Sequence, residues 1–214
     1  MTILTEQNHP GEAIFSCANK SLSLEQIIVL LASVVVSGEV VAKVSKAGAS
    51  AAAAAGNTGD GAMGAITVGA GSKPGAYTLT FIEPGTNAGD FSVEDPDGIN
   101  VGSGSVAAAF AGGGLGFTLA DGAADFVAGD QFTITVADGS GKYVALDPAG
   151  TDGSETAVGV MYAAVDATAA DKAGVIIARQ AELDGTVLVW PAGITADEKT
   201  AATEQLAAQG LIIR

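Results

Sequence analysis

The chain has 214 residues, of which 24 are acidic and nine are basic, so its formal net charge is −15. Nucleic-acid binding depends on Lys and Arg side chains that neutralise phosphates, and the sequence contains no basic cluster. An anionic membrane surface is disfavoured for the same reason. We therefore expect neither nucleic acid nor membrane as a partner, and the acidity indicates a solvated, self-repelling exterior.

The composition favours thin, closely packed elements. Apolar residues make up 48% of the chain, but aromatic residues only 5%, and 30 residues are Gly. Much of the apolar content is therefore Ala and Val, and elements built from them often complete their burial against a partner subunit. The length allows one large domain or two small ones.

Cysteine usage and the first residues predict synthesis in a cytoplasm. Cys17 is the single cysteine and cannot form an internal disulfide, so no oxidising compartment is implied. The opening MTILTE lacks the basic and apolar regions of a secretory signal. The most apolar run, residues 27–36 (IIVLLASVVV), is shorter than the roughly 18 residues that a membrane helix needs.

The first 61 residues predict strands followed by a joint. Residues 27–36 are β-branched and end at a Ser-Gly pair, which predicts one or two buried strands, and residues 39–44 predict another. Residues 46–61 (KAGASAAAAAGNTGDG) form an Ala/Gly-rich joint. Its five consecutive alanines could begin a helix, but the flanking Gly and Asn make a flexible hinge an equal alternative.

Residues 62–137 have a different sequence pattern, in which short runs of alternating apolar and polar residues lie between turn signals. These runs are residues 65–68, 76–82, 90–93, 116–119 and 131–136. Strands at this spacing predict a small antiparallel, Ig-like β-sandwich. Between residues 46 and 137 nine acidic residues face two lysines, and nothing in that balance indicates an ion-specific pocket.

The remaining residues, 138–214, predict further strands and one helix. The strands are expected at residues 142–146, 157–162, 174–179 and 211–213. Thr195 as N-cap with Glu198 three residues later forms a capping box, and Gly210 ends the helix. The predicted fold class is therefore mainly β with a short C-terminal helix.

Catalytic and metal-binding patterns are not found in the sequence. The single histidine, His9, lies among turn residues, and no G-x-S-x-G is present. With one Cys and one His the chain falls short of the four ligands that zinc needs. A glycosidase pairs its carboxylates across an aromatic-lined cleft, for which one Trp and three Tyr are few. We expect no enzyme activity, no cofactor and no metal.

One near-motif resembles the start of a calcium loop. Residues 95–98 (DPDG) open like an EF-hand loop, but the fifth, sixth and twelfth positions are Ile99, Asn100 and Val106. The required oxygen ligands and glycine are missing, so the segment predicts a turn.

Several stretches together resemble the lambda-type phage head decoration protein family. They are residues 141–153 (GKYVALDPAGTDG) followed by 157–160 (AVGV), then Val189-Trp190-Pro191 before a helix and an apolar strand, and upstream residues 9–12 (HPGE) and 38–44 (GEVVAKV). The matches cover roughly residues 8–45 and 138–214. The resemblance implies a β-clip-like core with α+β character from residues 17–45 and 138–214, with residues 62–137 as an inserted domain.

The resemblance also implies a structural role on a virion. Members of this family are homotrimers that bind the major capsid protein on the outer surface of expanded heads and stabilise them against the pressure of packaged DNA. This chain would then be made in the host cytoplasm. Residues 1–16 correspond to a flexible arm that adds a strand to a capsid sheet, and deleting residues 2–15 should abolish binding. The expected capsid contacts are Pro10, Gly11, Glu12, Ala13, Ile14 and Phe15.

Two points stay open at this stage. Trp190 and Pro191 correspond to a subunit contact in the family, but a core aromatic that anchors the turn is the favoured interpretation. The inserted residues 62–137 could instead form an adhesion module for host surface glycans, and a carboxylate-dependent hydrolase acting on capsule is the enzymatic alternative.

Overall fold

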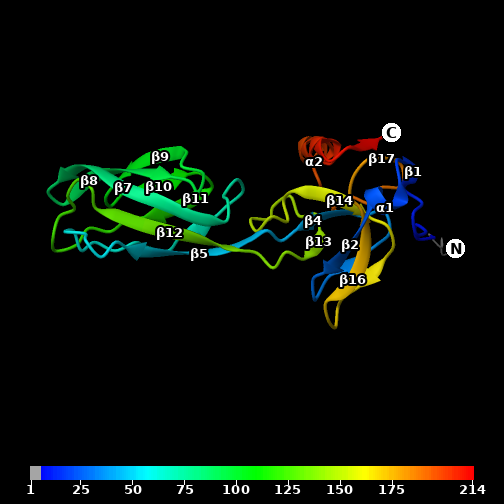
Figure 1. Cartoon of the computed structure of the whole chain (residues 1–214), viewed down its shortest axis with the longest axis horizontal. Coiled ribbons are helices and arrows are strands. Elements are labelled where there is room, and N and C mark those ends of the chain that lie inside the picture. The colour runs from blue at the N-terminus through cyan, green and yellow to red at the C-terminus, as the bar shows by residue number, and fades with distance from the viewer. Residues whose placement is uncertain (1–5) are drawn as a thin grey trace. The chain divides into compact units, whose positions relative to one another are not determined.

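The structure, a computed structural model, describes residues 6–214 and is mainly β, with 44% strand and 8% helix. This confirms the predicted fold class at that level. The chain divides into two compact units, which Figure 1 shows with their elements labelled. Unit 1 comprises Met1–Val44 and Gly141–Arg214, and unit 2 comprises Ser45–Ser140.

A closed five-stranded barrel forms the centre of unit 1. Its strands, in spatial order, are β13 (Tyr143–Ala145), β2 (Leu24–Val29), β16 (Lys172–Ile177), β14 (Ala157–Met161) and β4 (Val40–Lys43). Along β2, Ile27 and Val29 are buried whereas Ile28 is 44% exposed, which is the alternation of a strand with one face on a core. The apolar run 27–36 thus forms strands, as predicted, because its β-branched residues suit a half-buried pleat.

A second core in unit 1, called the helix-side core below, lies between a helix and a small sheet. The sheet has the order β1 (Ile14–Cys17), β17 (Ala181–Leu183) and β18 (Leu211–Ile213). Helix α2 (Ala196–Ala208) buries Ala202 and Leu206 against this core. Its predicted capping box is present: the Thr195 hydroxyl accepts from the Glu198 N–H, and the Glu198 carboxylate accepts from the Thr195 N–H.

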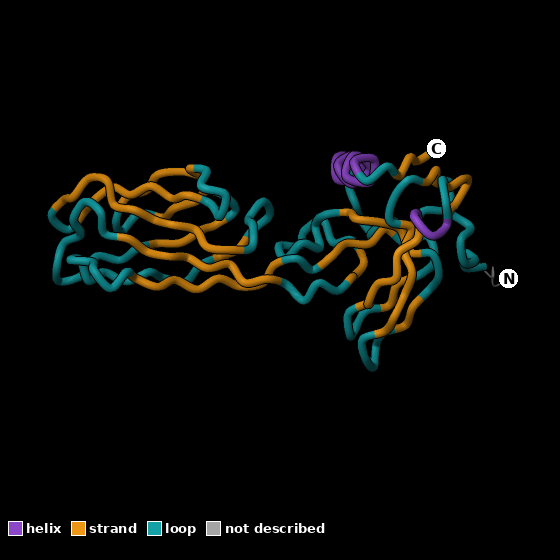
Figure 2. The backbone as a smooth tube through the Cα atoms, in the orientation of Figure 1, coloured by secondary structure: helices purple, strands orange, loops and turns teal. Residues whose placement is uncertain are grey.

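The other elements of unit 1 are short. Helix α1 (Lys20–Ser23) is one turn long, and its N-cap Asn19 accepts a hydrogen bond from the Ser21 N–H. Strands β3 (Val34–Val35) and β15 (Val165–Asp166) pair with each other. Figure 2 shows the loops, in teal, that connect these short elements.

Unit 2 consists of two antiparallel sheets. The larger has the order β5 (Lys46–Ala53), β12 (Gln131–Asp138), β7 (Gly75–Gly85), β8 (Ala88–Glu94) and β9 (Asn100–Ser105). The smaller has the order β10 (Ala109–Gly112), β11 (Leu115–Thr118) and β6 (Thr67–Val68).

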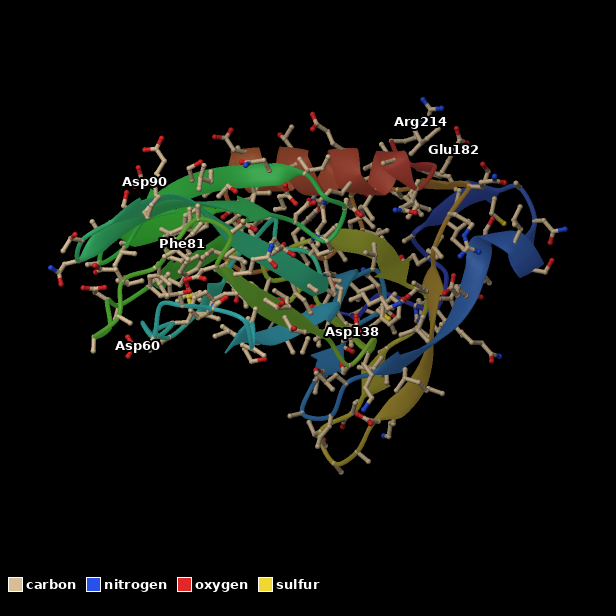
Figure 3. All side chains as sticks on the ribbon, turned by 60° about the vertical axis from the view of Figure 1, so that its left-hand side comes forward. Asp60, Phe81, Asp90, Asp138, Glu182 and Arg214 are labelled. Carbon is tan, nitrogen blue, oxygen red and sulfur yellow. The ribbon has the colours of Figure 1, made fainter. Side chains whose placement is uncertain are left out.

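Phenylalanine dominates the core of unit 2. Six of the seven phenylalanines of the chain lie there, and Phe81, labelled in Figure 3, stacks on Phe126 with ring centroids 4.2 Å apart. On β12, Phe132 and Ile134 point into this core while Thr133 between them is exposed. The alternation that predicted the strands is therefore the alternation of inner and outer faces.

The first half of the region expected to be a joint, residues 46–61, is a strand in the structure. Residues 46–53 form β5, which pairs with β12 in the register Ala51↔Ile134, so the alanines 51–53 lie in a strand and not in a helix. Tertiary pairing overrides the helix propensity of Ala here, since Ala49 and Ala51 pack against the core of unit 2. Strands β9 and β10 were also not predicted, because Gly, Ser and Ala give no alternating pattern.

Candidate functional site

The N-terminal segment is held against unit 1 from Asn8 onward. The side-chain amide of Asn8 donates to the Val187 carbonyl at 2.6 Å, and the Gly11 N–H donates to the Tyr162 carbonyl at 2.8 Å. Gly11 has a φ of +77°, and a Cβ there would lie 2.8 Å from the Tyr162 ring. Only glycine fits this turn without displacing the tyrosine.

The docked segment differs from the free arm expected over residues 1–16. Ala13 is 3% exposed within the helix-side core, and its carbonyl accepts a hydrogen bond from the Asp184 N–H at 2.9 Å. All of these partners lie far away in the sequence, and the expectation of a flexible arm came from the family resemblance. Residues 1–5 of the expected arm lie outside the described residues.

The six expected contact residues separate into three groups by exposure. Pro10, Glu12 and Phe15 are exposed, and Phe15 is 60% exposed. Ala13 is buried in unit 1, and its contact with a capsid stays a prediction. Gly11 and Ile14 are half-buried and hold the segment in place.

Strand β1 has an open edge and carries an aromatic side chain that a bulge turns to solvent. It is the outer strand of its sheet, and within residues 6–214 only β17 pairs with it. The register shifts between Ile14 and Ser16, so Phe15 is the extra residue of a β-bulge. Bulges commonly turn a side chain away from its own sheet, and here the ring is turned to solvent.

Polar groups fix the outer face of this sheet. Glu182 on β17 accepts hydrogen bonds from Arg214 at 2.6 Å and from the Ser16 hydroxyl at 2.8 Å (Figure 3 labels Glu182 and Arg214). The hydrogen bond from Arg214, with that from Ser16, holds the pKa of Glu182 below its ordinary value. Ile212 on the adjacent strand is 48% exposed. The site thus offers apolar surface, a fixed charge pair and a free strand edge.

Trp190 and Pro191 lie at the border of the helix-side core. Trp190 packs against that core half-buried, and the Lys199 ammonium lies 5.0 Å from its ring centroid. Its indole N–H is buried without a hydrogen-bond partner among the described residues. Pro191 lines a shallow hollow of about 200 Å³ together with Pro148. The packing agrees with the core interpretation, and the subunit contact stays a prediction.

The calcium-like loop is closed by a lysine. The Lys73 ammonium lies 2.6 Å from a carboxylate oxygen of both Asp95 and Asp97. The other Asp95 oxygen accepts from the N–H groups of Asp97 and Ile99. The hydrogen bond from Lys73 is the main cause that lowers the pKa of Asp95. The two carboxylates of the turn therefore share one cation supplied by the same chain.

A buried carboxylate organises another loop of unit 2. Asp130 is 4% exposed and accepts hydrogen bonds from the N–H groups of Thr58, Gly59 and Val127 at 2.9 to 3.1 Å. Burial by itself raises the pKa of Asp130, but these three donors outweigh it and the pKa lies below its ordinary value. The group is structural.

The other surfaces of the described chain offer little for ligand chemistry. In residues 6–214 no cluster of His, Cys, Asp and Glu is placed to hold a metal ion. No helix in the same range is long and apolar enough to span a membrane. On unit 2 a groove of about 360 Å³ is lined by Ile82, Glu83, Asp90 and serines, and its one aromatic, Phe91, is fully buried.

The comparison with protein families decides the identity. A family model described as bacteriophage lambda head decoration protein D matches residues 3–211, nearly the whole chain. The chain belongs to this family. The family is one of structural proteins, and membership assigns this chain to the phage capsid. The sequence resemblance is thereby confirmed.

Comparisons with individual proteins add no further argument. No curated protein matches this chain. Solved structures with partial similarity include the flagellar protein FlgL of Xanthomonas campestris, with a TM-score of 0.33 and 19% identity over 52% of this chain and 33% of that one. FlgL of Legionella pneumophila gives 0.35 and 18% over 49% and 37%. FlgK of Burkholderia pseudomallei gives 0.33 and 19% over 57% and 21%. The chain thus spans about a third or less of most of these proteins, and such scores support no inference.

Proposed function

We propose that this protein is a cement for the phage head: a homotrimer that binds the outer surface of the expanded capsid and stabilises it against internal DNA pressure. Membership in the decoration family supports capsid binding. Exposed apolar side chains on unit 1 support a further contact between subunits, since Ile28, Leu31 and Val34 are 44 to 55% exposed. Three copies acting together turn a modest contact into durable attachment through effective concentration.

The open edge of β1 is the proposed attachment point. A strand of the major capsid protein would pair along this edge, with backbone hydrogen bonds supplying much of the attachment. Phe15, turned to solvent by the bulge, would enter an apolar pocket of the capsid protein. Strand β1 keeps its pairing with β17, so the capsid strand becomes the fourth strand of the sheet. The exposed Phe15 on an unpaired strand edge is the observation that carries this proposal.

Binding to purified expanded heads that lack the protein tests the proposal. Phe15→Ala should weaken binding by about tenfold or more, because burying a phenylalanine ring stabilises a contact by about 1.5–3 kcal/mol. Ile99→Ala is the matched control, since Ile99 is 59% exposed but lies in unit 2. Equal binding by both variants would exclude the β1 edge as the attachment point.

Deletion of residues 2–15 gives a second, harsher test. The truncated protein should bind heads no longer, yet it also loses Ala13 from the helix-side core. Its mass and thermal unfolding must therefore be measured beside its binding. A truncated protein that binds heads as well as the full chain contradicts strand addition.

A further inference from the structure

Unit 2 is inserted between two paired strands of unit 1, β4 and β13, both labelled in Figure 1. The strands pair antiparallel as far as Tyr143↔Lys43. Beyond this pair, the Val44 N–H donates to the Lys142 carbonyl at 2.9 Å, and the Gly141 N–H donates to the Val44 carbonyl at 2.9 Å. The pairing therefore continues to the two residues between which unit 2 is inserted.

These hydrogen bonds have the pattern of a complete hairpin turn. In a common three-residue hairpin loop, a type I turn is followed by a glycine in the left-handed conformation, which forms a G1 bulge. Gly141 has a φ of +71° and donates the hydrogen bond that closes such a turn. With Ser45 joined to Ser140, these two serines would be the central residues, and a type I turn accepts serine there. Unit 1 thus retains the closing bonds of a turn that unit 2 interrupts.

Each unit has apolar cores of its own. The core that contains Phe81 and Phe126 is drawn from unit 2, whereas the cores that contain Leu206 and Val29 are drawn from unit 1. The barrel of unit 1 is closed by strands from both sides of the insertion, since β4 pairs with β13 and with β14. Burial of apolar surface is the main favourable contribution to folding, so each unit holds its own source of stability.

We propose that unit 2 is a self-contained module carried in a hairpin turn of unit 1, and that unit 1 folds and attaches to the head without it. Strand β1 and Phe15 belong to unit 1, so the proposed attachment point does not include unit 2. The statement about attachment rests on the proposed function, whereas the statement about folding does not. The turn is then a position at which unit 2 can be removed or exchanged for another domain.

Calorimetry of the full-length protein tests independent folding. Leu206 and Phe126 are fully buried, in the helix-side core of unit 1 and in the core of unit 2 respectively. Leu206→Ala should lower the melting temperature of one transition by roughly 10 °C, and Phe126→Ala should lower that of the other by a similar amount. If each variant melts as a whole in a single transition, the proposal is overturned.

Deleting residues 46–139, which joins Ser45 to Ser140, tests attachment. The shortened protein should melt within a few degrees of the unit 1 transition and bind purified heads as tightly as the full-length protein. Deleting residues 45–140 is the matched control, because it leaves Gly141 alone between the strands, and one residue is too short a loop for a hairpin. This second variant should melt at a lower temperature and bind heads more weakly.

The outcomes separate the two statements. If the full-length protein binds heads and a folded 46–139 deletion does not, attachment by unit 1 alone is wrong. If neither protein binds heads, the proposed function is wrong, and the melting experiments decide the statement about folding. A 46–139 deletion that does not fold, or that melts no higher than the 45–140 deletion, overturns the proposed turn.

Discussion

Replacing Gly11 with alanine should loosen the N-terminal segment from unit 1. Gly11 has a φ of +77°, and its new Cβ would lie 2.8 Å from the Tyr162 ring. The left-handed backbone costs a non-glycine residue about 1–2 kcal/mol. Movement of the tyrosine adds to this. A loss of that size shifts the docking equilibrium by a factor of about 5–30.

Hydrogen exchange at the Asp184 N–H reports this change directly. That group donates to the Ala13 carbonyl at 2.9 Å, so its protection depends on the docked segment. Its exchange should accelerate by about 5–30-fold in Gly11→Ala. If the capsid strand adds to docked β1, the variant should also bind heads more weakly.

Gly98→Ala is the matched control for this experiment. Gly98 has a φ of +76°, but its added Cβ meets nothing within 4 Å, and it lies in unit 2. It carries the same backbone strain without touching the segment. Unchanged protection at Asp184 in Gly11→Ala, or an equal change in Gly98→Ala, would refute the docking described here.

Three further predictions concern stability. Asp130→Asn should destabilise unit 2 by about 2–3 kcal/mol, because an amide cannot accept all three N–H donors. Since the pKa of Asp130 is lowered in the folded state, its contribution is complete at neutral pH and is lost as the pH falls through that lowered pKa. Calorimetry should therefore show that the stability of the variant falls less steeply with decreasing pH than that of the unchanged protein. An equally steep fall would contradict this. Phe126→Ala should cost about 3–5 kcal/mol by removing a ring stacked on Phe81, whereas the exposed Phe15→Ala should leave the melting temperature nearly unchanged. Thr195→Ala should cost about 1 kcal/mol by removing the cap of α2, measured by urea unfolding. Thr200→Ala, within the same helix, is its control, and equal losses would argue against the cap.

Local sequence patterns predicted the elements whose signals are local. The capping box at Thr195 and the alternation on β12 each depend on neighbours within a few residues, and both are found where expected. The family resemblance also rested on short sequence stretches, and the family model that matches residues 3–211 confirms it.

Elements whose stability comes from distant partners could not be predicted in this way. After Lys46, strand β5 consists of Ala, Gly and Ser, and it is a strand because β12, about 80 residues later, pairs with it. The docking of the N-terminal segment depends likewise on Tyr162 and Asp184. No sequence signal marked Phe15 as a bulge residue, because a bulge is defined only by the partner strand.

The central claim is that this chain attaches to a phage head as a repeated structural unit through the edge of β1. Its most direct test is the number of copies bound when purified heads lacking the protein are saturated with it, together with the mass of the unbound protein. We predict a trimer in solution, saturation in multiples of three copies, and a marked loss of occupancy for Phe15→Ala. A monomer that leaves the heads undecorated would contradict the account.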